Sequence, residues 1–227
     1  MTRLLLISSS NVYGYGFLDH AEPEIRRILL GRNSIGFIPF AQHDHEAYTL
    51  LVSERFALMN IEVRQMRDAS DIGKAEALFI GGGNTFRLLK ALHDRALLDP
   101  IRQRICDYGV PYIGSSAGTN VACPTIKTTN DMPIVQPPSF AALDLVRYQI
   151  NPHYYDADPE STHKGETREE RIRQFHEEND APAIGLREGT MLWVEDGATT
   201  LLGLHSARLF RRGEEPVEVD PGSAIAV

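Results

Sequence analysis

The chain has 227 residues, of which 42% are hydrophobic and 24% are charged, values close to the average of soluble globular proteins. This composition excludes a disordered, fibrous or membrane-spanning chain, and the length favours one α/β domain over residues 1–227. There are 23 Lys and Arg against 31 Asp and Glu, so the formal net charge is -8. Because no basic run stands out, we expect no nucleic-acid partner.

The first apolar run, residues 4–7, is too short for a signal segment or a membrane span and is expected to be a buried strand. Short apolar runs then alternate with amphipathic stretches, a pattern typical of βαβ units. The further strands expected in the first half are 34–38, 61–63, 75–80 and 111–113. The helices expected between them are 23–30, 48–59, 84–91 and one with Asp99 as N-cap and Ile101, Ile105 and Tyr108 on one face. These elements predict an α/β fold with a mostly parallel sheet flanked by helices.

After about residue 120 the pattern loosens, because prolines divide the chain into loops and short strands. A helix is expected again after Thr167, which has capping-box spacing to Glu170. Four late strands are predicted, with an antiparallel hairpin at the end: 183–186, 191–194, 199–204 and 207–210. The two cysteines, Cys106 and Cys123, have neither disulfide-framework nor metal-site spacing, so a reducing, cytoplasmic location fits best.

The segment Gly114-Ser115-Ser116-Ala117-Gly118 has the G-x-S-x-G pattern, and it lies between an expected strand and an expected helix. A serine on a sharp strand-to-helix turn projects its hydroxyl from the edge of the sheet. Small neighbours are needed there because the backbone doubles back on itself. Ser116 occupies the nucleophile position of this pattern. The alternative is an ordinary Gly/Ser loop that caps a helix.

A second glycine-rich turn, Gly81-Gly82-Gly83, follows the expected strand 75–80. A phosphate-binding loop is one interpretation, since helix N-termini attract anions. The dinucleotide pattern fails, because Phe86 stands where the third glycine is required, and no P-loop lysine follows. If this strand neighbours that of Ser116, the backbone N–H groups of Gly82 or Gly83, with that of Ala117, are placed to hold an oxyanion. A tight turn alone would explain one glycine but not easily three.

A serine nucleophile needs a base, and His153 is a candidate because it ends an expected strand that runs into a loop. A loop histidine that makes one hydrogen bond is an equally good interpretation of this residue alone. His43-Asp44-His45 suggests a metal, but with no third ligand evident a solvated turn is the better interpretation. Asp131 and Glu188 are candidate carboxylates to orient the imidazole, and the residues alone do not choose between them.

With these residues in view, the sequence resembles peptidase E, the α-aspartyl dipeptidases, across essentially the whole chain. The shared segments are 37–40, 81–86, 114–120, 124–126, 128–135, 149–153 and 163–168. The last three segments are the most specific to the family, because they are long and no requirement of the fold explains their composition. Ser115 departs from the family, in which a bulkier residue is expected.

The resemblance implies a fold like that of the class I glutamine amidotransferases (flavodoxin-like) and a cytosolic serine peptidase that cleaves dipeptides with an N-terminal aspartate. It implies Ser116 as the nucleophile and His153 as the base. Glu188 is preferred as the carboxylate that orients the base and Asp131 as a group near the substrate, for example its ammonium, but both stay candidates. Asn84 and Arg168 lie in shared segments and are expected to bind substrate, Arg168 through the aspartyl carboxylate.

Two alternatives stay open. One is a cyanophycinase-like or β-aspartyl serine peptidase of the same fold, and the other is a non-enzymatic small-molecule binding module that kept the glycine turns. No metal or other cofactor is expected, because the sequence shows no ligand cluster. The sequence does not indicate the oligomeric state or the preferred second residue of the dipeptide.

Overall fold

The apolar runs of the first half form the parallel centre of an eight-stranded sheet in the computed structural model, which describes residues 1–158, 160, 162 and 164–227. The parallel strands, in spatial order, are β1 (Arg3–Ile7), β5 (Tyr112–Ser115), β4 (Leu78–Ile80), β2 (Ser34–Ile38) and β3 (Glu62–Gln65). β4 lies next to β5, as the glycine-turn hypothesis requires. The carboxyl ends of β1, β4 and β5 therefore meet at one edge of the sheet.

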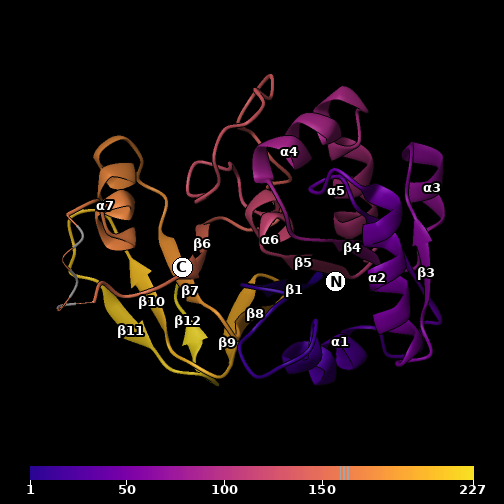
Figure 1. Cartoon of the computed structure of the whole chain (residues 1–227), viewed down its shortest axis with the longest axis horizontal. Coiled ribbons are helices and arrows are strands. Elements are labelled where there is room, and N and C mark those ends of the chain that lie inside the picture. Colours follow the sequence, from indigo (N-terminus) through magenta and orange to yellow (C-terminus); the bar gives the residue numbers. More distant parts are fainter. Residues whose placement is uncertain (159, 161, 163) are drawn as a thin grey trace.

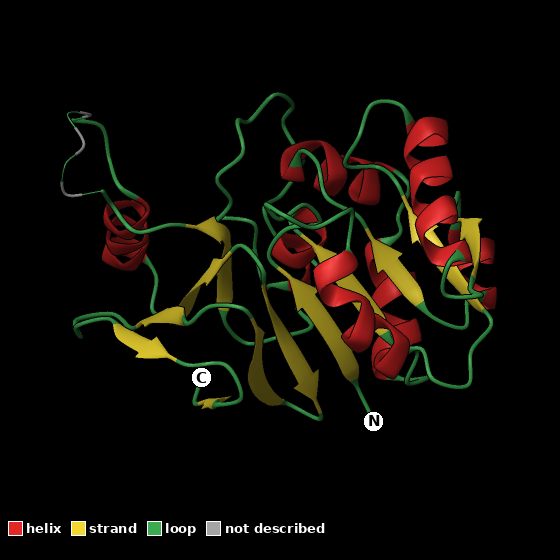
Figure 2. Cartoon of the chain, turned by 60° about the horizontal axis from the view of Figure 1, so that its bottom comes forward, coloured by secondary structure: helices red, strands yellow, loops and turns green. Residues whose placement is uncertain are grey.

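Helices cover both faces of this sheet, as Figures 1 and 2 show. One face packs against α1 (Glu22–Ile28), which follows the short 3-10 helix η1 (Asp19–Ala21), and α2 (His45–Ala57). The other face packs against α3 (Ala69–Lys74), α4 (Thr85–Asp94), α5 (Leu98–Cys106) and α6 (Ala117–Ala122). Successive residues of β1 alternate between the two hydrophobic clusters, because side chains of a strand point to opposite faces in turn. The predicted α/β fold is confirmed.

Antiparallel strands complete the main sheet, and later strands form a second sheet that mixes parallel and antiparallel pairs. β8 (Thr190–Glu195), β9 (Ala198–Gly203) and β12 (Ala224–Ile225) extend the main sheet from β1. The second sheet has the order β11-β10-β7-β6. Its strands are β6 (Gln149–Tyr154), β7 (Ala183–Arg187), β10 (Ala207–Phe210) and β11 (Val217–Val219), and α7 (Arg168–Glu178) packs on it. The four late strands exist as predicted, but they divide between two sheets, with antiparallel hairpins at β8–β9 and β10–β11.

Two local expectations are wrong. The N-cap of α5 is Leu97, so Asp99 lies inside the first turn, where it pairs with Arg102 (Nη1 to Oδ1, 3.1 Å). The helix ends at Cys106, and Tyr108, expected on its buried face, is exposed. The loops and short strands expected after residue 120 are present: residues 123–148, all of which the structure describes, form an extended loop with one β-bridge between Thr125 and Ala141, and the short strand β6 with Pro152 follows.

The capping box of α7 is present as predicted. The Thr167 side chain accepts a hydrogen bond from the Glu170 backbone (3.1 Å), and the Glu170 carboxylate accepts one from the Thr167 backbone (2.6 Å). Within the described ranges, no helix is long and apolar enough to cross a membrane.

Gly118 fixes how closely α6 approaches β4, and this contact yields a stability prediction. A Cβ at Gly118 would overlap with the backbone carbonyl oxygen of Ile80, which cannot move without shifting the strand. We expect Gly118→Ala to cost about 1–3 kcal/mol of unfolding free energy or more, and thus to lower Tm by about 2–4 °C per kcal/mol. The matched control is Gly73→Ala in α3, where a Cβ meets nothing within 4 Å and Tm should not fall. Equal Tm values for both variants would contradict this account.

Candidate active site

Ser116 stands on a strained turn between β5 and α6. Its φ is 52° and its ψ is -107°, a conformation that is costly for a residue with a side chain. The turn is held from outside, because the Ser116 N–H donates to the Ile7 carbonyl of β1 (3.0 Å). Small neighbours are required, since a Cβ at Gly114 would lie 2.7 Å from the Gly118 carbonyl oxygen. This is the geometry expected of a nucleophile elbow.

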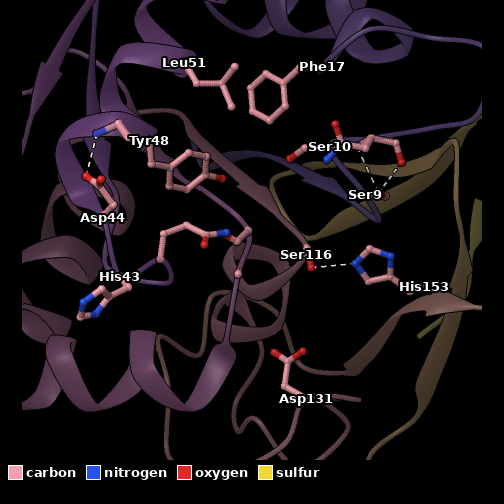
Figure 3. A pocket seen from close by; sticks show the side chains of 15 residues that line it. Ser9, Ser10, Phe17, His43, Asp44, Tyr48, Leu51, Ser116, Asp131 and His153 are labelled. Carbon is pink, nitrogen blue, oxygen red and sulfur yellow. Dashed lines mark hydrogen bonds between the residues drawn. The ribbon is translucent and has the colours of Figure 1, made fainter. Parts of the chain in front are cut away.

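The structure separates the two adjacent serines. The Ser115 hydroxyl is buried and lies 2.7 Å from the Ser10 hydroxyl, so it is engaged inside the protein. The Ser116 Oγ instead lies 2.8 Å from Nε2 of His153 (Figure 3). Position 116 therefore carries the hydroxyl that faces a base.

His153 connects Ser116 to Glu188. Its Nδ1 lies 2.8 Å from Oε1 of Glu188, while its Nε2 faces Ser116. The residue has a φ of 55° and sits at a β-bulge, where the pairing of β6 with β7 shifts between Pro152 and Tyr154. The carboxylate of Glu188 is about half exposed.

Asp131 does not contact His153. One of its oxygens accepts hydrogen bonds from the Thr85 backbone N–H (2.7 Å) and from the Thr85 hydroxyl (2.6 Å), at the N-terminus of α4. Of the two candidate acids, the one within hydrogen-bond distance of the imidazole is therefore Glu188. Asp131 borders the cavity in front of Ser116.

Each of the three consecutive glycines after β4 has its own steric reason. A Cβ at Gly81 would overlap with the Tyr48 hydroxyl, one at Gly82 would lie 3.1 Å from the Ser116 Cβ, and one at Gly83 would lie 2.5 Å from the Ala41 carbonyl oxygen. The Gly82 backbone thus lies directly beside Ser116, and Ala117 is the first residue of α6. Burial raises the pKa of Tyr48 to about 12, so this hydroxyl is protonated at neutral pH.

A cavity of about 820 Å³ lies in front of Ser116 and His153 (Figure 3). Ser9 and Ser10 contribute polar groups to its lining, and Phe17 and Leu51 contribute an apolar wall. In the view of Figure 3, Asp131 lies on the other side of Ser116 from this wall.

The two residues expected to bind substrate have different surroundings. The Asn84 side chain caps α4: its Oδ1 accepts from the Arg87 N–H (3.0 Å) and its Nδ2 donates to the Met132 carbonyl (2.9 Å). Arg168 is half-buried and borders a neighbouring hollow of about 580 Å³ together with His153 and Glu188. His153 therefore stands between the hollow of Arg168 and the cavity of Ser116.

Arg168 is held by polar and aromatic contacts. Its Nη1 donates to Oδ1 of Asn130 (2.7 Å), and its guanidinium lies 5.0 Å from the centre of the Tyr155 ring. Burial lowers the pKa of Arg168, although a guanidinium stays charged in any physiological range. Asn130 in turn donates to the carbonyl of Pro152 (2.7 Å), the residue before His153.

His43 and Asp44 of the motif His43-Asp44-His45 line the cavity in front of Ser116. Asp44 of His43-Asp44-His45 caps α2, because its Oδ1 accepts from the Ala47 N–H (2.9 Å). His163, which begins one of the resemblance segments, lies outside the described residues.

Sequence reasoning missed Ser8, Ser9 and Ser10. They follow β1. Ser9 and Ser10 line the cavity, while the Ser8 hydroxyl accepts a hydrogen bond from the His153 backbone N–H (2.9 Å). A sequence signal for them exists, since a polar triplet directly after a buried strand lies at the carboxyl edge of the sheet, where the sites of open α/β folds are found.

Comparisons with known proteins identify the family of the chain. A model of peptidase family S51 matches residues 4–202. The chain belongs to peptidase family S51. The curated relatives include Peptidase E of Streptomyces coelicolor, 49% identical over 228 residues, which covers 99% of this chain and 93% of the relative. They also include the Drosophila melanogaster protein named "Probable alpha-aspartyl dipeptidase", 44% identical over 225 residues, 96% of this chain and 94% of that protein.

A solved structure shares the fold of this S51 chain. The crystal structure of a peptidase from an acI-B1 Actinobacterium superposes with a TM-score of 0.71 at 16% identity and covers 100% of this chain and 97% of the other. At this identity the match concerns the fold alone.

The separation of Ser115 from Ser116 can be tested with a serine-directed fluorophosphonate. Ser116→Ala should abolish labelling, because it removes the hydroxyl that faces His153. Ser115→Ala should keep most of the labelling rate, since it removes a hydroxyl that is paired with Ser10 inside the protein. Mass spectrometry of the labelled peptide is the measurement, and equal losses in the two variants would show that the nucleophile is misassigned.

Proposed function

We propose that the chain is a serine dipeptidase that hydrolyses dipeptides with an N-terminal aspartate through an acyl-enzyme. The observation that carries the proposal is the continuous hydrogen-bond chain Ser116–His153–Glu188 at an elbow, with distances of 2.8 Å and 2.8 Å, in a member of family S51. The aspartate preference rests on the names of relatives, among them an alpha-aspartyl dipeptidase.

In this proposal the Ser116 Oγ attacks the peptide carbonyl while Nε2 of His153 takes its proton. His153 then gives that proton to the leaving amine, which departs as the second amino acid. Water, deprotonated by the same nitrogen, hydrolyses the ester that joins the aspartyl group to Ser116. Glu188 holds the imidazole in the tautomer that presents Nε2 to Ser116 and stabilises the imidazolium.

The negative charge of the tetrahedral intermediate needs donors beside Ser116. The backbone N–H groups of Ala117 and of Gly82 or Gly83 are proposed for this role, because Ala117 begins a helix and the Gly82 backbone lies next to the Ser116 Cβ. Such donors are fixed by the fold before the reaction starts, which is what makes them effective.

Substrate choice is assigned to two charged residues on either side of His153. Asp131 on the cavity side is proposed to attract the free ammonium of the dipeptide, and Arg168 in the neighbouring hollow its aspartyl carboxylate. Asn84 supports this region as the cap of α4, which presents Thr85 to Asp131. A cytoplasmic location completes the proposal, and Cys106 and Cys123, free among the described residues, support it.

The triad assignment gives a kinetic prediction. Glu188→Gln should lower kcat by about 10²–10⁴-fold with little change in KM, because the imidazole loses the carboxylate that orients it. Asp131→Asn should act mainly on KM, since Asp131 touches Thr85 and the cavity rather than His153. Steady-state kinetics on Asp-Leu decides, and the reverse pattern would move the triad to Asp131.

The substrate assignment is tested with Asp-Leu, β-Asp-Leu and Asn-Leu. Wild type should prefer Asp-Leu. Arg168→Ala should lower kcat/KM for Asp-Leu, with a loss of transition-state binding free energy of about 1.5–3 kcal/mol. The kcat/KM for Asn-Leu should barely change. Arg168→Lys should recover part of the loss, because a point charge cannot reproduce the planar fork. Arg171→Ala, a more exposed arginine of the same helix, is the control and should leave both substrates unchanged.

Two outcomes would redirect this proposal. Faster cleavage of β-Asp-Leu than of Asp-Leu would favour the β-aspartyl or cyanophycinase-like alternative. No cleavage of any of the three, together with no fluorophosphonate labelling, would favour a binding module.

A further inference from the structure

The residue after β1, Ser8, has a fully buried side chain whose hydroxyl makes two hydrogen bonds to the second sheet. Its Oγ accepts the His153 backbone N–H (2.9 Å) and donates to the Leu186 carbonyl of β7 (2.7 Å). The hydroxyl is thus inserted between β6 and β7 at the point where their own pairing is interrupted by the bulge at Pro152 and Tyr154. The Ser8 hydroxyl therefore replaces the hydrogen-bond partners that β6 and β7 lose at the bulge.

The same residue holds the turn that carries Glu188. Glu188 and Gly189 connect β7 to β8, and Ser8 contacts this turn on both sides. Its hydroxyl bonds to Leu186 before the turn, and its backbone N–H donates to the Thr190 carbonyl after it (3.1 Å). The Glu188 carboxylate is about half exposed, and among the described residues its hydrogen-bond partner is His153, so the position of its backbone decides where it points.

His153 depends on this contact for a physical reason. Its φ of 55° is a conformation that a residue with a side chain keeps only when its surroundings enforce it. The Ser8 hydroxyl fixes the N–H of this residue, and Asn130 fixes the carbonyl of Pro152 just before it (2.7 Å). Together they hold the peptide bond that precedes the His153 side chain.

We propose that Ser8 is a positioning residue, whose hydroxyl sets the relative placement of His153 and Glu188 and so the alignment of His153 with Ser116. This role rests on the proposed serine mechanism, but not on the identity of the substrate. Without the hydroxyl, the His153 N–H and the Leu186 carbonyl lose their partner, and the backbone of His153 is free to relax towards an ordinary conformation.

The test compares Ser8→Ala, Ser8→Thr and a control, Thr199→Val. The control removes a hydroxyl that is similarly buried, bonded to the Tyr148 hydroxyl (3.0 Å), and outside the site. Three quantities are measured: kcat and KM for Asp-Leu, the rate of fluorophosphonate labelling, and Tm. Ser8→Ala should lower kcat and the labelling rate on the order of 10²-fold, with KM little changed, because small displacements of reacting groups have effects of this size.

The other variants separate positioning from general stability. Thr199→Val should lower Tm by about as much as Ser8→Ala does, because each variant removes one buried hydroxyl. It should nevertheless keep kcat and the labelling rate within about twofold of wild type. Ser8→Thr keeps the hydroxyl and should restore most of both rates. If its extra methyl prevents folding, Ser8→Cys replaces it and should fall between wild type and Ser8→Ala, since a thiol is a weak donor and acceptor.

Three results would overturn the role of Ser8. The first is a kcat and a labelling rate of Ser8→Ala within about twofold of wild type. The second is a loss of kcat and labelling rate in Thr199→Val equal to that in Ser8→Ala. The third is a Ser8→Thr or Ser8→Cys variant that reacts no faster than Ser8→Ala. If wild type reacts with the fluorophosphonate but cleaves no Asp-Leu, the dipeptidase function fails while the labelling rates still decide the role of Ser8.

Discussion

The hydrogen bond between Ser116 and His153 joins two residues that belong to different sheets. Ser116 follows β5 in the main sheet, whereas His153 lies on β6 and its partner Glu188 follows β7, both in the second sheet. A bond of 2.8 Å tolerates little relative movement, so the two sheets must be held in a fixed arrangement. The carboxyl end of β1 does this, since Ile7 receives the Ser116 N–H and Ser8 bonds to His153.

Two strained residues face each other across this junction. Ser116 and His153 both have positive φ without being glycine, and each is held by hydrogen bonds from neighbouring elements. Strain of this kind costs of order 1–3 kcal/mol per residue and persists only where the rest of the fold compensates. The compensation is visible in the tight packing of the elbow, where Gly118 touches Ile80 and Gly82 touches Ser116. The side-chain geometry of the site is therefore a property of the whole sheet edge rather than of its local segments.

The parallel half of the fold and the elbow could be predicted from the sequence because their signals are local. Apolar runs and glycine turns depend on residues within one element and its adjoining turn, and the segment Gly114 to Gly118 between β5 and α6 is such a case. The second sheet could not be predicted, since the assignment of β9 and β10 to different sheets depends on long-range pairing. For the same reason the residues alone did not choose between Asp131 and Glu188. Which carboxylate reaches the imidazole depends on the β-bulge at His153, and no local sequence pattern predicts this bulge.

The charge of the chain makes specificity a local problem. With a net charge of -8 the protein as a whole repels an anionic aspartyl group, so recognition has to come from single residues close to the scissile bond. In the proposed arrangement the ammonium of the dipeptide lies towards Asp131 and its side-chain carboxylate towards Arg168, with His153 between the two hollows. An N-terminal aspartate carries both charges close to the carbonyl that Ser116 attacks. An internal aspartate lacks the ammonium, and a neutral first residue lacks the carboxylate, so either would lose one of the two ion pairs that position the carbonyl.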